Sequence, residues 1–220
     1  MTLQPVRLSA PRPAESPGGP HSSTAIEAGS ASPGRCVPAY WAHHSWLEAA
    51  RPVRNERSAR AAHAFLFDRY PQLAEVALAD ASSVLPVWPR PACARLCRVV
   101  AALALARSLR RVVAAQAHTA FAASVAPRLL NAIQRHPRAL VADVNVEPAA
   151  SPFDRHDMTA LGLALVQRAD VDLRHAFWWS LRLPREVAQS AQRYGVRDLS
   201  AAGAAALLAD AKLLMEVPRC

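Results

Sequence analysis

The sequence predicts an all-α protein: an irregular multi-helix bundle that follows a disordered tail. Alanine is the commonest residue, leucine and valine are plentiful and glycine is scarce. This composition favours helices, because Ala and Leu lose little conformational freedom on entering one. Apolar residues recur at three- and four-residue spacing between prolines, which indicates helices separated by breaks. With 220 residues, the chain is long enough to bury one sizeable core.

Residues 1–36 have the composition of a disordered tail. They hold six prolines, six serines and four of the seven glycines, with almost no aliphatic periodicity. Such a segment cannot bury enough apolar area to offset the entropy lost on ordering. We therefore expect a tail at 1–36 and a helical domain at 37–220, which opens on the aromatic segment around Trp41, Trp46 and Leu47.

Helix signals recur along the first half of the domain. Asn55 is placed to cap a helix that runs to Tyr70, and Pro71 ends it while starting a second helix. The prolines of residues 85–91 predict a rigid connector or hinge. The longest helix is expected from Ala92 to about Ala126, apolar on most sides, as suits the centre of a bundle.

The second half of the domain continues in the same way. Pro127 should break or restart the long helix, which then continues to His136. Residues 140–147 alternate apolar and polar and include β-branched residues, so we expect an extended edge segment or a small hairpin there, and at most one short strand. Next come a helix capped by Asp154 or Asp157 and an amphipathic segment over residues 171–183.

The last two helices are also marked by punctuating residues. Pro184 should open one of them, and Gly195 should close it at the C′ position, where glycine takes a positive φ most easily. The final helix, capped at Asp198 or Ser200, should bury leucines and stop at Pro218.

No motif in the sequence identifies a reaction. Neither GxxxxGK[ST] nor GxGxxG occurs, and GxSxG and HExxH are also missing. Asp154, Asp157, Asp170 and Asp172 could act as paired carboxylates in acid–base chemistry, but each stands where a helix should begin, and capping explains them. We therefore expect a protein that is not an enzyme and that uses no cofactor and no metal.

Cysteines and histidines leave two open alternatives. Cys93 and Cys97 could supply two thiolate ligands from one helix face, but no second pair with metal-ligand spacing accompanies them, which favours core thiols. His43 and His44 could form a titrating or ligand cluster, or one of them could be a partly buried histidine with one hydrogen bond. Four scattered cysteines do not indicate a disulfide framework.

The formal charge of +9 invites a nucleic-acid or acidic-membrane interpretation. Arg107, Arg110 and Arg111 form the densest cationic group and share a helix flank. They could contact phosphates or an acidic protein, or they could be a solvated flank. Because no basic run carries interleaved aromatic residues, a basic helical nucleic-acid-binding protein is only the alternative to protein binding.

Two adjacent tryptophans are a second candidate contact. Trp178 and Trp179 should point about 100° apart on a helix, so we do not expect both in the core at once. Exposed tryptophan is enriched in binding hot spots, although partial burial under a neighbouring helix is equally consistent with the pattern.

Nothing in the sequence indicates a membrane span or a secretory signal. The first residues lack a basic segment followed by an apolar stretch. The most apolar run, Val99–Ala106, is far shorter than the roughly 18 residues that a span requires. We therefore expect a cytoplasmic protein.

Several segments together resemble a known family. These are Tyr40-Trp-Ala-His-His-Ser-Trp-Leu47, Ala62-His-Ala-Phe-Leu-Phe-Asp-Arg-Tyr-Pro-Gln-Leu73, Arg182-Leu-Pro184 and Tyr194-Gly195, followed by a leucine-rich last helix. From about residue 40 to 217 the chain resembles the SctK-type accessory proteins of bacterial type III secretion systems, in particular the Hrp-type branch of plant-associated and related β-proteobacteria. His44 stands where the family's entry pattern has proline.

The resemblance implies a non-enzymatic adaptor of the sorting platform at the cytoplasmic face of the inner membrane. Family members join the cytoplasmic domain of the SctD-type inner-membrane ring protein to pods of the SctQ-type protein. The resemblance implies no small-molecule substrate, and contact with the membrane only through partners. The candidate partner-binding residues are Trp41, Trp46, Leu47, Arg107, Arg110, Arg111, Trp178 and Trp179, of which the first three are also expected to anchor the entry segment.

Overall fold

The computed structural model describes residues 42–47, 55–71, 73, 89–112, 114–147, 154–169, 173–196 and 198–216, without the side chains of 173–175. All of them belong to one unit, Pro33–Cys220. The expected tail, nearly all of the second helix and the proline-rich connector up to residue 88 lie outside the described residues, as do Trp41, Asp170 and Asp172.

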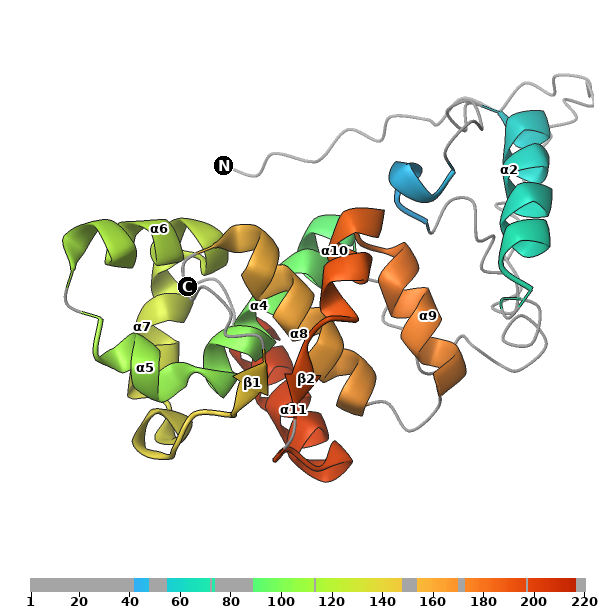
Figure 1. Ribbon diagram of the computed structural model, residues 1–220. Helices are drawn as coiled ribbons and strands as arrows, with labels where there is room; N and C mark the ends of the chain where they lie inside the picture. Colours follow the sequence, from blue (N-terminus) through green and yellow to red (C-terminus); the bar gives the residue numbers. More distant parts are fainter. Residues whose placement is uncertain are drawn as a thin grey trace, which may run out of the picture. The chain divides into compact units, whose positions relative to one another are not determined.

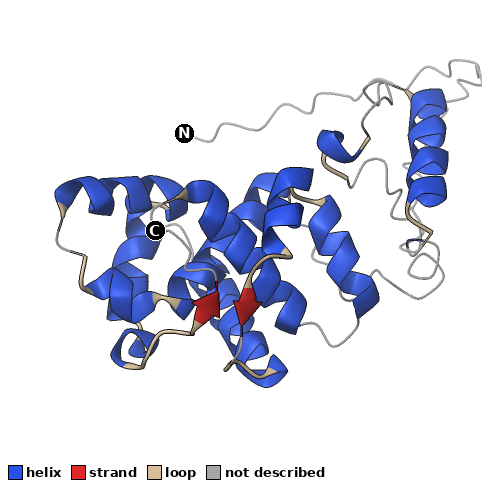
Figure 2. Cartoon of the chain, in the orientation of Figure 1, coloured by secondary structure: helices blue, strands red, loops and turns tan. Residues whose placement is uncertain are grey.

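The described chain is α-helical, as predicted, with one two-stranded antiparallel sheet (Figure 1, Figure 2). A short 3₁₀ helix, η1 (His44–Trp46), precedes the α-helices. A second one, η3 (Pro137–Leu140), lies between α7 and the strand β1 (Val146–Glu147). The α-helices are α2 (Glu56–Arg69), α4 (Arg90–Ala104), α5 (Ala106–Arg110), α6 (Ala115–Val125), α7 (Pro127–Arg135), α8 (Arg155–Ala169), α9 (Leu173–Leu181), α10 (Arg185–Ala191) and α11 (Ala201–Glu216).

Helices α4 and α8 form the centre of the bundle and lie side by side (Figure 1). Every residue of α4 from Leu96 to Ala104 is buried, and so is every residue of α8 from Met158 to Val166 except the half-buried Ala164. Helices α10 and α11 pack against α8, and α11 also packs against α4. Burial on several sides explains why both sequences are apolar all round instead of along one stripe.

The two central helices touch at Gly162 of α8. A Cβ atom at this position would lie 1.8 Å from the carbonyl oxygen of Cys97 and 2.7 Å from its Cα. Both of these are backbone atoms of α4, and they cannot move aside by a side-chain rotation. Only glycine therefore allows the two helix backbones to approach this closely.

Arg98 links α4 to α6 and α8. Its Nε donates a hydrogen bond to the carbonyl oxygen of Ser124 at 2.5 Å, and its Nη1 donates to Oγ1 of Thr159 at 3.4 Å. Burial, with the nearby Arg155 charge, lowers the pKa of Arg98 to about 10, so the side chain is still charged at neutral pH. The guanidinium thus satisfies polar groups of two neighbouring helices, at the cost of removing a charge from water.

The single long helix predicted over residues 92–126 is wrong, because the chain forms α4, α5 and α6 there. A remote segment docks at the first break. Asp143 accepts hydrogen bonds from the backbone N–H of Arg107 at 2.9 Å and of Ser108 at 3.0 Å, and Val144 N–H donates to the carbonyl of Ala104 at 2.9 Å. In a continuous helix, these N–H and carbonyl groups would form hydrogen bonds to other backbone groups of the same helix. Asp143 and Val144 provide hydrogen bonds in their place, so the helix can end here.

The extended segment expected near 140–147 is present as β1 (Val146–Glu147), directly after η3 and a short loop. It pairs antiparallel with β2 (Gly195–Val196), and Glu147 faces Gly195 in the register. The prediction that Gly195 ends a helix at the C′ position is wrong. Helix α10 already ends at Ala191, and no described glycine has a positive φ.

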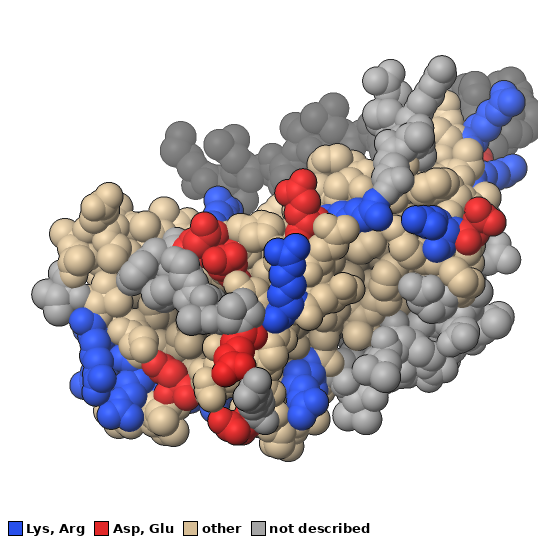
Figure 3. All heavy atoms as spheres, in the orientation of Figure 1, with Lys and Arg blue, Asp and Glu red and all other residues tan. Residues whose placement is uncertain are grey.

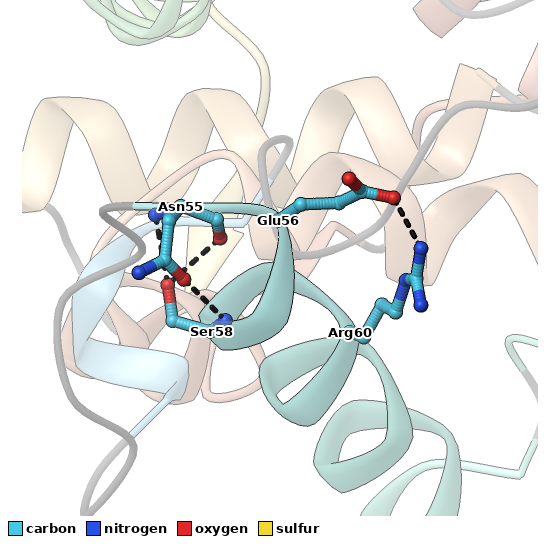
Figure 4. Close-up of polar contacts among 4 residues, drawn as sticks. All are labelled: Asn55, Glu56, Ser58 and Arg60. Atoms are coloured by element: carbon cyan, nitrogen blue, oxygen red, sulfur yellow. Dashed lines mark hydrogen bonds and ion pairs between the residues drawn. The ribbon is translucent and has the colours of Figure 1, made fainter.

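Asn55 caps α2 as predicted, and Ser58 completes a reciprocal cap that was not part of the prediction (Figure 4). The side-chain oxygen of Asn55 accepts from the N–H of Ser58 at 2.9 Å, and Oγ of Ser58 accepts from the N–H of Asn55 at 3.0 Å. This reciprocal pair satisfies two N–H groups that have no partner inside the helix. The exposed ion pair between Glu56 and Arg60 contributes little, since water screens both charges.

Four further helix starts lie at residues that the sequence predicts. Asp154 caps α8 by accepting from the N–H groups of its first turn, and Ser200 caps α11 in the same way. Helix α7 starts at Pro127, after Ala126 with a φ of 95°. Pro184 immediately precedes α10. Among the described helices, none combines the length and the apolar character that a membrane crossing requires.

Replacing Gly162 with alanine should destabilise the fold strongly. The new methyl group collides with the backbone of α4, so we expect the free energy of unfolding, measured by urea denaturation, to fall by about 3 kcal/mol or more.

The matched control is Gly203→Ala, since Gly203 is also a helical glycine. Its added Cβ would meet Cδ1 of Leu199 at 2.8 Å, and this side-chain end can rotate away. Alanine also has the higher helix propensity, by about 1 kcal/mol, so we expect no loss of stability in the control. Equal losses in the two variants would contradict the close crossing of α4 and α8.

Candidate protein-interaction surface

The aromatic entry segment is part of the core. Trp46 and Leu47 are both buried, and Nε1 of Trp46 donates to the carbonyl of Leu183 at 2.8 Å. The indole also packs edge-on against Tyr70 and Phe177, with ring centroids 5.6 and 5.7 Å apart. These contacts support the expected anchoring role, but they leave Trp46 and Leu47 little surface for a partner.

The expectation that Trp178 and Trp179 cannot both be in the core is wrong. They are only 1% and 5% exposed. Helix α9 packs against α8 and α10, and the entry segment reaches it through a hydrogen bond from His43 N–H to the carbonyl of Leu181 at 2.6 Å. Because other elements pack on more than one side of α9, the side chains of Trp178 and Trp179 are both buried although they point about 100° apart.

The arginines predicted as a cationic flank are exposed. Arg107 and Arg110 lie on α5, and Arg111 is its C-cap residue. The start of this short helix is fixed by Asp143, which also accepts a hydrogen bond from the hydroxyl of Ser108. The structure therefore holds the three arginines on one anchored helix at the surface.

Next to this flank lies a hollow that we call the basic pocket. Its volume is about 430 Å³, and it is lined by Arg110, Gln134, Arg135, His136 and Leu140. The lining joins the C-terminal end of α5 to the C-terminal end of α7 and to η3. Figure 3 shows Lys and Arg side chains gathered over this end of the molecule, at the lower left.

Two acidic side chains that contact the elements of the pocket are already engaged in hydrogen bonds. Both oxygens of Asp143 accept hydrogen bonds at the start of α5. Asp210 of α11 accepts from Nε of Arg138 at 2.6 Å, an interaction that also fixes η3 against α11. No carboxylate lines the described pocket, so its positive charges are not neutralised from within.

An exposed aliphatic pair adjoins the pocket. Leu140, which lines it, is 72% exposed, and the next residue, Val141, is 62% exposed. In contrast, Ala139 of the same 3₁₀ turn is buried and anchors the turn to the core. Arginine is enriched in protein–protein interfaces, so an exposed aliphatic pair beside arginines is compatible with a surface that binds another protein.

Sequence reasoning found Arg110 but missed the rest of the pocket. Gln134, Arg135 and His136 end the helix that the sequence predicts up to His136. The alternating pattern predicts an extended segment from Leu140, but Leu140 is the last residue of η3. The basic run from Arg135 to Arg138 was a signal that could have been used. That this run faces α5 depends on the break at residue 105, which the periodicity did not indicate.

The histidine pair behaves as the plainer interpretation expects. Nδ1 of His43 lies 2.9 Å from Oγ of Ser45, and the ring contacts that of His44 at a tilt of 37°, with centroids 4.0 Å apart. Burial, followed by the charges of His44 and Arg90, lowers the pKa of His43. His43 is thus a half-buried histidine held by its neighbours.

The candidate carboxylates have structural contacts. Asp154 caps α8, and Asp157, one turn further, lies against Tyr194. Burial together with the Asp157 carboxylate raises the pKa of Tyr194 to about 12. Within the described residues, no three His, Cys, Asp or Glu side chains come together in a way that could hold a metal ion.

Cys93 and Cys97 are buried on α4, and neither forms a disulfide. Burial raises the pKa of Cys97 to about 12. Burial also raises the pKa of Cys93, although a hydrogen bond and the positive charge of Arg182 partly oppose this effect. Since the thiolate is the reactive form, both side chains should be chemically inert in the folded protein.

Comparison of the chain with protein-family models, with curated proteins and with solved structures gives no match.

Thiol labelling tests whether Cys93 and Cys97 are chemically inert in the folded protein. In the double variant Cys36→Ser/Cys220→Ser, only Cys93 and Cys97 remain. We expect Ellman's reagent to react at least about 100-fold more slowly with the folded variant than with the same variant in urea, because both thiols are protonated and covered. Rapid labelling of two thiols in the folded state would instead indicate an accessible, reactive pair.

Proposed function

We propose that this chain is a non-enzymatic adaptor of a bacterial type III secretion system. It acts at the cytoplasmic face of the inner membrane and links the SctD-type ring protein to the SctQ-type pod protein of the sorting platform. It reaches the membrane only through these partners, and its working parts are exposed surfaces of a helical body.

One observation carries the general part of this proposal. The basic pocket and the exposed pair Leu140 and Val141 lie together on anchored elements. Partner surfaces commonly combine apolar side chains with charged ones such as arginine. A rigid surface of this kind binds at low entropic cost, because little of it must be ordered on contact.

The specific part of the proposal comes from sequence resemblance. The aromatic entry segment around Trp46, the segment that ends α2 and the Arg182-Leu-Pro184 turn are the residues that resemble the SctK-type proteins. Trp46 and Leu183 are joined by a hydrogen bond, so two of the resembling segments form one structural unit. A shared internal framework is what related adaptors would retain.

Binding of nucleic acid is the alternative, favoured by the exposed arginines of α5 and the formal charge of +9. The lining of the basic pocket contains no tryptophan, tyrosine or phenylalanine. Stacking on such rings is the usual means of holding single-stranded bases, so the pocket lacks it. We therefore rank protein binding first.

Co-purification tests the adaptor proposal directly. The full-length chain, carrying an affinity tag, should retain both the SctQ-type pod protein and the cytoplasmic domain of the SctD-type ring protein of its own secretion system. Retention of neither protein at physiological salt would contradict the proposal.

An electrophoretic shift assay with duplex and single-stranded DNA decides the alternative. We expect no shift at physiological salt. A shift that persists there and weakens steeply as salt rises further would favour the nucleic-acid function, because phosphate contacts release counterions.

A further inference from the structure

We propose that the basic pocket binds an acidic–aliphatic segment of a partner protein. A Glu or Asp side chain of that segment enters between Arg110 and Arg135, and a neighbouring aliphatic side chain covers Leu140 and Val141. This inference takes one point from the proposed adaptor function, namely that the natural ligand is a protein.

The first step of the argument is charge. Arg110 and Arg135 line one hollow that no described carboxylate shares, while Asp143 and Asp210 are occupied by backbone N–H groups and by Arg138. An arginine at the end of a helix is favourable by itself, because it offsets the partial negative charge of the last carbonyls. This effect explains why an arginine stands at the end of α5 and another at the end of α7. It does not explain why both arginines line the same hollow.

The second step is hydrogen-bond geometry. The planar guanidinium of arginine matches a carboxylate with two parallel N–H donors. Gln134 adds an amide donor to the lining. Nδ1 of His136 accepts the N–H of Arg138 at 3.4 Å, which leaves Nε2 as the ring nitrogen that can donate to a ligand. The lining thus offers mainly donors, as a carboxylate requires.

The third step is the apolar neighbour. Leu140 and Val141 are two of the three large hydrophobic side chains that stand out as exposed in the described chain, and they are adjacent. An aliphatic surface offers nothing for a nucleic-acid base to stack on. It does suit the leucine, isoleucine or valine of a peptide, which would remove both side chains from water.

The fourth step is rigidity. Asp143 fixes the start of α5, and η3 is fixed by the ion pair between Arg138 and Asp210 and by its own buried residue, Ala139. Both walls of the pocket are therefore held before a ligand arrives. A preformed site loses little conformational freedom on binding, so even a short segment should bind measurably.

Fluorescence anisotropy with the full-length chain tests the proposal. The probe is a labelled synthetic peptide of alternating Glu and Leu, and the comparison probes are the same peptide with Gln in place of Glu and a single-stranded oligonucleotide. We expect the Glu–Leu peptide to bind at least about tenfold more tightly than the Gln–Leu peptide, because only the carboxylates meet the arginines. Tighter binding of the oligonucleotide, with loss of peptide binding in competition, would overturn the proposal.

Variants with matched controls localise the binding. Arg110→Ala/Arg135→Ala should weaken peptide binding by about tenfold or more, whereas Arg57→Ala/Arg69→Ala removes the same charge from exposed positions of α2 and should change it less than about twofold. Leu140→Ser should weaken binding several-fold. Its control is Leu213→Ser, at another exposed leucine, which should have no effect. Equal effects of a variant and its control would overturn the assignment.

The two proposals fail in different ways. If the pod or ring protein binds the wild-type chain and the Arg110/Arg135 variant equally well, the pocket inference is wrong and the adaptor function stands. If the Glu–Leu peptide binds through the pocket but neither secretion protein is retained, the pocket inference stands and the secretion role is wrong. Circular dichroism of every variant confirms that the helices are intact, as expected for exposed positions.

Discussion

The contact of Gly162 with the backbone of Cys97 is the constraint on which the rest of this fold depends. It lets α4 and α8 approach without side chains between their backbones at the crossing. Helices this close shield each other, and the remaining faces of both are covered by α6, α10 and α11. The burial of nine consecutive residues, Leu96–Ala104, follows from that arrangement, and so does the need to satisfy Arg98 internally through Ser124 and Thr159.

The way in which the central helix α4 ends determines the geometry of the basic pocket at the surface. Helix α4 ends at Ala104, where the segment around Asp143 and Val144 takes over the backbone hydrogen bonds. The chain turns there into α5 and brings Arg110 to the end of α7. A continuous helix over 92–126 would have carried the arginines away from Arg135 and His136. The basic pocket is thus a consequence of how α4 ends.

Much of the fold could be predicted because local rules decide it. Asn55, Asp154 and Ser200 cap the helices that they were expected to cap, and Pro127 restarts a helix as expected. Propensity, capping and proline chemistry act within one or two turns, so they can be read from neighbouring residues. The all-α class follows from the same short-range signals.

What could not be predicted depends on residues far apart in the chain. The break at Leu105 needs Asp143, β1 needs Gly195 as its partner, and the joint burial of Trp178 and Trp179 needs helices on two sides of α9. For the same reason the flank at Arg107, Arg110 and Arg111 was visible in the sequence, whereas the pocket was not. Its other half comes from α7 and η3, and only the tertiary fold joins the two.

Native-state hydrogen exchange tests the central claim most directly. If the close crossing of α4 and α8 organises the fold, the amides of Val99–Leu103 and of Leu161–Val166 should exchange most slowly of all. Their opening free energy should equal that of global unfolding. Exchange of these amides at rates similar to those of the peripheral helix α6, well before global unfolding, would contradict the account.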